Sequence, residues 1–180
     1  MTSKPKIKRF RGERYAEQNM VNHTRLSSIR INTWGYMQYG HGAKVFLIDN
    51  SFTGDKYLEC LMDNLRRTNA KMDELIFMQD NCSIHRVVEV IAFFEKDNWR
   101  VLNHPPESPD CNPYENIWNL ASRQLNSYLL THFVNTPTEL FKIVKGFIES
   151  IPVSMVNHLI DSMPARLAEV RKNLGNHTKY

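Results

Sequence analysis

The stretch Leu75-Ile76-Phe77-Met78-Gln79-Asp80-Asn81 decides the fold, because an apolar run stops there abruptly at polar side chains. A short apolar run with this ending is typical of a buried strand that reaches the edge of a sheet. In open α/β sheets, functional sites lie at the carboxyl ends of the strands. The stretch therefore predicts a central strand, with Asp80 at the position where a site would form.

A second acidic residue, Glu115, lies in the first turn of a predicted helix, and 34 residues separate it from Asp80. Asn112-Pro113 is a strong helix start, because Asn caps free backbone amides and Pro at the first helical position loses no hydrogen bond. The buried face of this helix is predicted to consist of Ile117, Trp118, Ala121 and Leu125. A helix that begins beside the sheet edge can bring Glu115 to Asp80.

Two carboxylates at one sheet edge suit Mg²⁺, which binds one or two carboxylates and completes its octahedron with water and substrate phosphate. Two such ions about 3.5 to 4 Å apart clamp the attacking and leaving oxygens of a phosphodiester displacement. Asp80 and Glu115 are therefore the candidate catalytic residues and metal ligands.

The remaining segments predict the layers around this edge. The unbroken apolar run at 45–48 indicates a strand covered on both faces, joined to the preceding strand as a hairpin. The pattern β-β-α-β-α-β-α-α-α predicts an α/β layered domain. We expect strands at 29–33, 45–48, 75–78 and 99–102, and helices from Thr53, at 87–94, from Pro113, from the capping box Thr136–Glu139, and in a last region that Pro164 interrupts and that ends near Leu174.

Positive charge is concentrated at the start of the chain. The net charge is +4, and residues 1–14 hold six basic side chains against Glu13 alone, so we divide the chain into a basic arm (1–14) and a domain (15–180). Such an arm either contacts phosphate or is simply solvated, and both readings stay open. Its candidate DNA-binding residues are Lys4, Lys6, Lys8, Arg9, Arg11 and Arg14.

Several classes of protein are disfavoured. No stretch has the roughly 18 consecutive apolar residues of a membrane helix, and no apolar signal-peptide core follows the basic start. The three cysteines are far apart and form no Cys-x-x-Cys pair, which favours a reducing compartment over a disulfide framework or a zinc site. The expectation is an intracellular protein.

The acidic motifs resemble those of Tc/mariner-type transposases. The 34-residue interval is typical of the branch of that family whose last catalytic residue is Glu. The resemblance implies an RNase H-like fold, a mixed sheet with helices on both faces, and an Asp-Asp-Glu triad with two Mg²⁺ ions. The residues that carry it are Gln79-Asp80-Asn81 with His85, Ser108-Pro109-Asp110 with Asn112-Pro113, Glu115 and Trp118, and the flanking Gly12-Glu13-Arg14-Tyr15, Trp34-Gly35 and Ser162-Met163-Pro164-x-Arg166.

The resemblance also implies function and partners. Members of the family cleave and transfer DNA strands, so the implied partners are transposon ends and target DNA, in a homodimer in the nucleus, rather than a membrane or a small-molecule substrate. The family's first catalytic Asp would lie further before Asp80 than this chain reaches, together with the first, central strand of the sheet. We therefore expect an N-terminally truncated catalytic domain that is inactive as it stands. The alternative is a non-catalytic DNA-binding remnant or a decayed gene product.

Simpler roles compete for the same residues. Asp80 could be a strand-end turn residue, and Glu115 could be the capping-box partner of Asn112. His85 could contact DNA, orient the site or make local hydrogen bonds. Asp110 is a weaker candidate ligand, whereas Asp49 would lie about 10 to 14 Å from Asp80 across the sheet, too far to share a metal ion. The set Arg166, Arg171, Lys172 and Lys179 forms a second basic cluster, as expected near a helix end.

Overall fold

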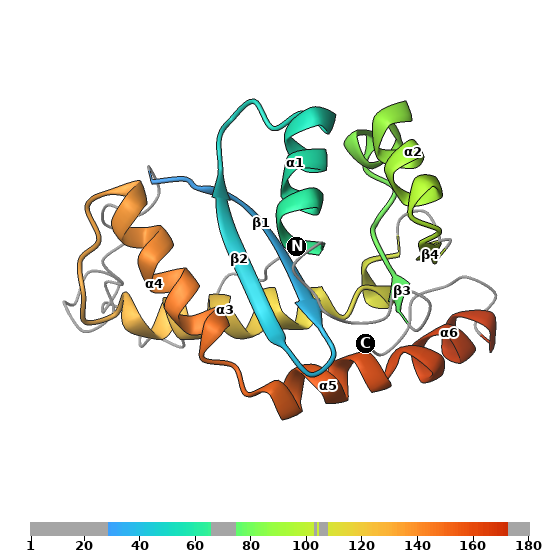
Figure 1. Ribbon diagram of the computed structural model, residues 1–180. Helices are drawn as coiled ribbons and strands as arrows, with labels where there is room; N and C mark the ends of the chain where they lie inside the picture. The colour runs from blue at the N-terminus through green and yellow to red at the C-terminus, as the bar shows by residue number, and fades with distance from the viewer. Residues whose placement is uncertain (1–28, 66–74, 103, 105–107, 173–180) are drawn as a thin grey trace, which may run out of the picture.

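The computed structural model describes residues 29–65, 75–102, 104 and 108–172. Within these residues the order of elements is the predicted one, with two short 3₁₀ helices added (Figure 1). The elements are β1 (Asn32–Gln38), β2 (Gly42–Ile48), α1 (Gly54–Leu65), β3 (Ile76–Phe77), η4 (Ser83–Arg86), α2 (Val88–Lys96), β4 (Arg100–Val101), η5 (Pro109–Cys111), α3 (Tyr114–Tyr128), α4 (Pro137–Glu149), α5 (Val153–Asp161) and α6 (Met163–Lys172).

The predicted hairpin is confirmed, but its first strand lies further along the chain. β1 and β2 pair in antiparallel fashion from Asn32 opposite Ile48 to Gln38 opposite Gly42. The strand thus runs through Trp34 and beyond, whereas the alternation at 29–33 precedes most of it. The turn uses Gly40 and Gly42, whose φ angles of 77° and 87° lie in the left-handed region that glycine adopts without steric cost.

The second pair of strands is short and separate from the first. β3 and β4 are parallel, with Ile76 opposite Arg100 and Phe77 opposite Val101. Among the described residues the strands form two two-stranded sheets, β1-β2 and β3-β4, instead of one continuous mixed sheet. Ile76 is exposed, which corrects the expectation of a buried central strand; among the described residues β3 pairs only with β4.

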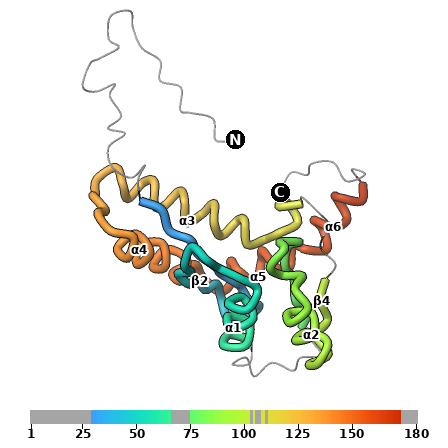
Figure 2. The backbone as a smooth tube through the Cα atoms, turned by 90° about the horizontal axis from the view of Figure 1, so that it is seen from above, coloured from blue at the N-terminus to red at the C-terminus, as the bar shows by residue number. Residues whose placement is uncertain are grey.

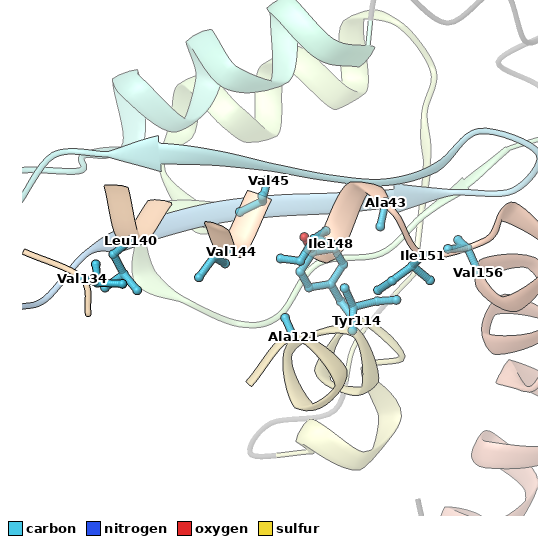
Figure 3. Close-up of a cluster of buried hydrophobic side chains, with 11 residues drawn as sticks. Ala43, Val45, Tyr114, Ala121, Val134, Leu140, Val144, Ile148, Ile151 and Val156 are labelled. Atoms are coloured by element: carbon cyan, nitrogen blue, oxygen red, sulfur yellow. The ribbon is translucent and has the colours of Figure 1, made fainter. Parts of the chain in front are cut away.

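Helices cover both faces of the hairpin (Figure 2). On one face, Ala43 and Val45 point toward α3, α4 and α5 and meet Val144 and Ile148 in the larger core (Figure 3). Leu47, on the same face, is exposed, so the predicted cover does not extend to the end of β2. The other buried members of this core are Tyr114, Ile117, Ala121, Val134, Leu140, Ile151 and Val156.

The opposite face of the hairpin meets a second core between α1 and α2. The ring centroid of Trp34 in β1 lies 6.2 Å from that of Tyr57 in α1, which joins the hairpin to this core. The second core contains Tyr57, Leu61, Leu65, Val90, Phe93, Phe94 and Trp99. The site described below lies beside Tyr57, so its base is a packed, aromatic-rich interior.

Two helix starts near the end of the chain follow the predicted chemistry. The Thr136 hydroxyl accepts a hydrogen bond from the Glu139 amide, and the Glu139 carboxylate accepts one from the Asn135 amide, one residue earlier than in a standard capping box. The last helical region breaks at Ser162, so that Pro164 falls in the first turn of α6, where proline is tolerated. In the described ranges no helix is long and apolar enough to cross a bilayer.

Arg166 corrects the predicted second basic cluster. Its side chain is buried, with only 3% of the residue exposed, and therefore does not belong to a solvated surface. The guanidinium donates to the Ser162 hydroxyl at 2.8 Å and to the Asn116 side-chain oxygen at 2.8 Å. Arg166 thus ties α6 to the first turns of α3. Arg171 and Lys172 are exposed, and Lys179 lies outside the described residues.

Candidate functional site

Asp80 lies just beyond the carboxyl end of β3, as predicted. One carboxylate oxygen, Oδ1, accepts a hydrogen bond from the Cys82 amide at 3.0 Å, which makes a local turn. The same oxygen lies 2.8 Å from Nδ1 of His85. The Asp80 side chain is nevertheless 57% exposed. The predicted turn role is therefore present, and it leaves most of the carboxylate open to solvent.

Asp80 lines an open hollow of about 280 Å³ between the ends of β3 and β4. The Asn81 side-chain amide donates to the backbone oxygen of His104 at 2.7 Å and ties the two strand ends together. Arg86, an exposed side chain of η4, places a positive charge in the same hollow. The hollow is lined by Gln79, Asp80, Asn81, Arg86, Val101, Leu102 and His104.

Glu115 lies in the first turn of α3, as predicted, and does not close a capping box. Asn112 does act as the cap, since its side-chain oxygen accepts a hydrogen bond from the Tyr114 amide at 3.1 Å. The backbone N–H of Asn112, which a capping-box glutamate would bind, donates instead to the carbonyl of Pro109 at 2.9 Å. The structural alternative for Glu115 is therefore wrong, and its carboxylate is available for another role.

The charge of Asp80 acts on the Glu115 carboxyl group. Burial raises the pKa of Glu115, and the negative charge of Asp80 raises it further. Like charges have this effect only when they lie close to one another, because Coulomb interactions weaken with distance and with solvent between the charges. Asp80, just beyond β3, and Glu115, in the first turn of α3, are thus within electrostatic range of one another.

The Glu115→Gln variant is expected to be more stable than the wild-type protein at neutral pH. Because the folded state raises the pKa of Glu115, wild-type stability falls as the pH rises from the ordinary carboxyl value through the raised one. An amide at this position removes that loss, so the gain should vanish in strong acid. Urea unfolding at several pH values measures it, with Glu95→Gln at an exposed position of α2 as control. An equal gain for both variants would contradict the prediction.

The other candidate residues are placed differently. Asp49 forms an ion pair with Lys56 and accepts a hydrogen bond from the Ser51 amide, so it is engaged away from Asp80. The Asp110 side chain and the basic arm lie outside the described residues. The His85 side chain is 13% exposed and faces Asp80, which fits the orienting role; its contact with DNA stays a prediction.

The sequence did not predict two features of the site. The Tyr57 ring packs against His85 in a tilted arrangement with ring centroids 4.3 Å apart, although its position in a helix stripe indicated only a core residue. Arg166 fixes Asn116, the neighbour of Glu115, from 50 residues away. The only signal for Arg166 was its place in the Ser162-Met163-Pro164 motif, which said nothing about its partner.

A mixed α/β domain with an exposed carboxylate just beyond the carboxyl end of a strand has the layout in which sites of α/β proteins form. Residues 2–133 match the family of DDE superfamily endonucleases, and the chain belongs to that family. Its relatives are Tc/mariner transposases, so the resemblance noted in the motifs is confirmed.

Two relatives illustrate the extent of the match. The Tcb1 transposase of Caenorhabditis briggsae is 28% identical over 179 residues, covering 97% of this chain and 63% of the relative. The Tc1 transposase of Caenorhabditis elegans is 33% identical over 105 residues, covering 58% of this chain and 37% of the relative. The chain spans 37% to 63% of the length of the curated relatives reported for it.

Solved structures show the same fold. The Mos1 transposase catalytic domain with Raltegravir and Mg aligns with a TM-score of 0.64 at 19% identity, over 77% of this chain and 73% of that one. The Mos1 paired-end complex with the left transposon end aligns with a TM-score of 0.62 at 20% identity, over 76% of this chain and 41% of that one. The RNase H-like, mixed α/β class predicted from the sequence is confirmed.

Proposed function

We propose that this chain is part of a DDE transposase in which Asp80 and Glu115 hold the divalent metal ions used for DNA strand cleavage and transfer. The observation that carries the proposal is the placement of an exposed Asp80 carboxylate just beyond the carboxyl end of β3, with its charge acting on Glu115 in the first turn of α3. Support comes from the family match and from Mos1 structures that contain Mg or Mn.

The donor set fits a hard divalent cation. Among the described residues no hydrogen bond to Oδ2 of Asp80 is present, and Glu115 is not used as a cap. Carboxylate oxygens are the ligands that Mg²⁺ prefers, and a cation between them would relieve their repulsion. When bound, such ions position the phosphate and neutralise the charge that develops on it. The protein's own contribution is to hold the two carboxylates in place.

Two carboxylates leave the proposed site incomplete. Within the described residues no group of three or more His, Cys, Asp or Glu side chains is placed to hold a metal ion. No described strand lies between β1 and β3, where the family resemblance expects a strand with a further Asp. We therefore assign the third ligand to a segment outside the described residues, and expect no DNA cleavage from Asp80 and Glu115 alone.

DNA is the proposed partner, in the form of transposon ends and target, bound by a homodimer in the nucleus. The basic arm at 1–14 is the proposed backbone contact, because lysine and arginine runs bind phosphates with strong salt dependence. One observation favours non-catalytic DNA binding as a second candidate function. The described residues contain no group of three or more side chains that could hold a metal ion, whereas the arm at 1–14 holds six basic side chains against Glu13 alone.

Calorimetric titration with Mn²⁺ tests the metal site. The Asp80→Ala and Glu115→Ala variants are each expected to weaken binding by about tenfold or more, since each removes a ligand. The matched control is Asp49→Ala, which removes an exposed carboxylate held by Lys56 and should leave the affinity unchanged. Equal affinity in the wild-type protein and both ligand variants would overturn the proposal.

Plasmid nicking and DNA binding separate the two candidate functions. Non-catalytic DNA binding predicts salt-dependent duplex binding without nicking in Mg²⁺. Mg²⁺-dependent nicking that Asp80→Ala abolishes would support the catalytic function and exclude the non-catalytic one. A variant in which the six basic residues of the arm are replaced by neutral ones tests the arm. If that variant still binds duplex DNA, the arm is not the DNA contact.

A further inference from the structure

The Asp80 carboxylate is held asymmetrically. Both polar contacts described for its side chain, the hydrogen bond from the Cys82 amide and the 2.8 Å ion-pair contact with His85 Nδ1, are made by Oδ1. Two donors on one oxygen fix the rotation of the carboxylate about its side chain. Oδ2 has no hydrogen-bond partner among the described residues, and the Asp80 side chain is 57% exposed and lines the hollow between β3 and β4.

The His85 ring can hold this arrangement because it is itself held. Its Nδ1 lies 2.8 Å from Asp80 Oδ1 and 3.1 Å from the Asp80 backbone oxygen. Both neighbours are acceptors, so Nδ1 must carry the hydrogen. The ring packs against the tilted ring of Tyr57, and only 13% of the side chain is exposed. The imidazole is therefore a fixed donor.

Tyr57 and Gln79 close the arrangement from behind. The Tyr57 hydroxyl donates to the Gln79 side-chain oxygen at 2.6 Å, and the Gln79 side-chain nitrogen donates to the His85 backbone oxygen at 3.4 Å. Tyr57 is 1% exposed within the second core. Burial, and then the charge of Asp80, raise the pKa of Tyr57, so its hydroxyl stays a donor. Asp80 is thus connected, through His85, Gln79 and Tyr57, to the packed core beside α1.

We propose that His85, backed by Tyr57 and Gln79, is a positioning residue that binds Oδ1 of Asp80 and leaves Oδ2 as the oxygen that faces the divalent cation. The proposal rests on the proposed function, since it assumes that Asp80 is a metal ligand. It assigns His85 an indirect role, in which the ring touches Asp80 and not the metal. Removal of the Nδ1 donor should therefore weaken metal binding without removing a ligand.

Mn²⁺ titration of the full chain tests the inference through conservative and disruptive variants. His85→Leu should weaken binding by about tenfold, which is the usual effect of losing a hydrogen bond to a metal ligand. His85→Asn places a side-chain N–H near the position of Nδ1 and should stay within about threefold of the wild type, since the donor is kept. His41→Leu, at an exposed position in the hairpin turn, is the matched control and should have no effect.

The variants also separate failure of the inference from failure of the proposed function. If Asp80→Ala leaves Mn²⁺ affinity unchanged, Asp80 is not a ligand and the proposed function fails first. Suppose instead that Asp80→Ala abolishes Mn²⁺ binding. The positioning role is then wrong if His85→Leu leaves the affinity unchanged, or if His85→Leu and His85→Asn weaken it equally. Thermal unfolding identifies any variant that has lost its fold.

A measurement on the wild-type protein avoids variants altogether. Nitrogen-15 NMR of the histidine rings distinguishes hydrogen on Nδ1 from hydrogen on Nε2. The geometry requires His85 to keep a hydrogen on Nδ1 in the metal-free protein and after Mg²⁺ is added. A neutral ring with its hydrogen on Nε2 alone, or a shift of Nδ1 typical of direct metal coordination, would overturn the proposal.

Discussion

The Gly35→Ala variant is expected to lose about 3 kcal/mol of folding free energy, because an added methyl group has no room in this packed interior. A Cβ atom at position 35 would lie 2.0 Å from the Tyr114 hydroxyl oxygen and 2.7 Å from the backbone oxygen of Lys44. These two atoms are joined by a hydrogen bond of 2.7 Å, so the methyl group would have to displace both.

The loss at Gly35 should reach the candidate site. Tyr114 directly precedes Glu115, and moving its ring would shift the first turn of α3. We therefore expect weaker Mn²⁺ binding as well as a lower urea midpoint. Gly146→Ala is the control: nothing lies within 4 Å of its added Cβ in α4, so it should stabilise the protein by about 0.5 to 1 kcal/mol. Similar midpoints for both variants would contradict the prediction.

Replacement of Arg166 by methionine is expected to cost about 2 to 4 kcal/mol, because it leaves two partly buried acceptors without their donor. The Ser162 hydroxyl and the Asn116 side-chain oxygen each lose a hydrogen bond of 2.8 Å. The contact between α6 and the first turns of α3 is lost with them. Since Asn116 is the neighbour of Glu115, metal affinity should fall together with stability.

Arg171→Met provides the matched control for this prediction. Arg171 lies on the same helix at an exposed position, so its replacement should change stability by no more than about 0.5 kcal/mol. Urea unfolding gives the stability of each variant, and Mn²⁺ titration gives the effect on the site. If the two methionine variants are equally stable, the buried contact of Arg166 does not hold α6 in place.

Local chemistry explains which parts of the fold could be predicted from the sequence. The Asn112 cap and the Thr136 cap involve neighbouring residues, so their signals are complete within a few positions. The bounds of β1 were less well predicted, because pairing with β2 extends the strand beyond its apolar alternation. The separation of β1-β2 from β3-β4 depends on which strands are present to pair with them, and a local sequence pattern does not contain this information.

The candidate site shows the same division. Asp80 and Glu115 could be found because a strand end and a helix start each carry a local signal and a motif. Their supports could not be found, because Tyr57 reaches His85 and Arg166 reaches Asn116 across long stretches of chain. A buried arginine and an exposed one have the same sequence signal near a helix end.

The two separate two-stranded sheets have a consequence for how the chain behaves during folding. Among the described residues no strand pairs with the outer edge of β1 or with the second edge of β3. Open strand edges are templates for other chains, and they lead to swapped or aggregated forms when nothing covers them. Whatever segment fills that position would protect the protein from self-association as well as complete its acidic site. Solubility and catalytic competence would then be acquired in the same folding step.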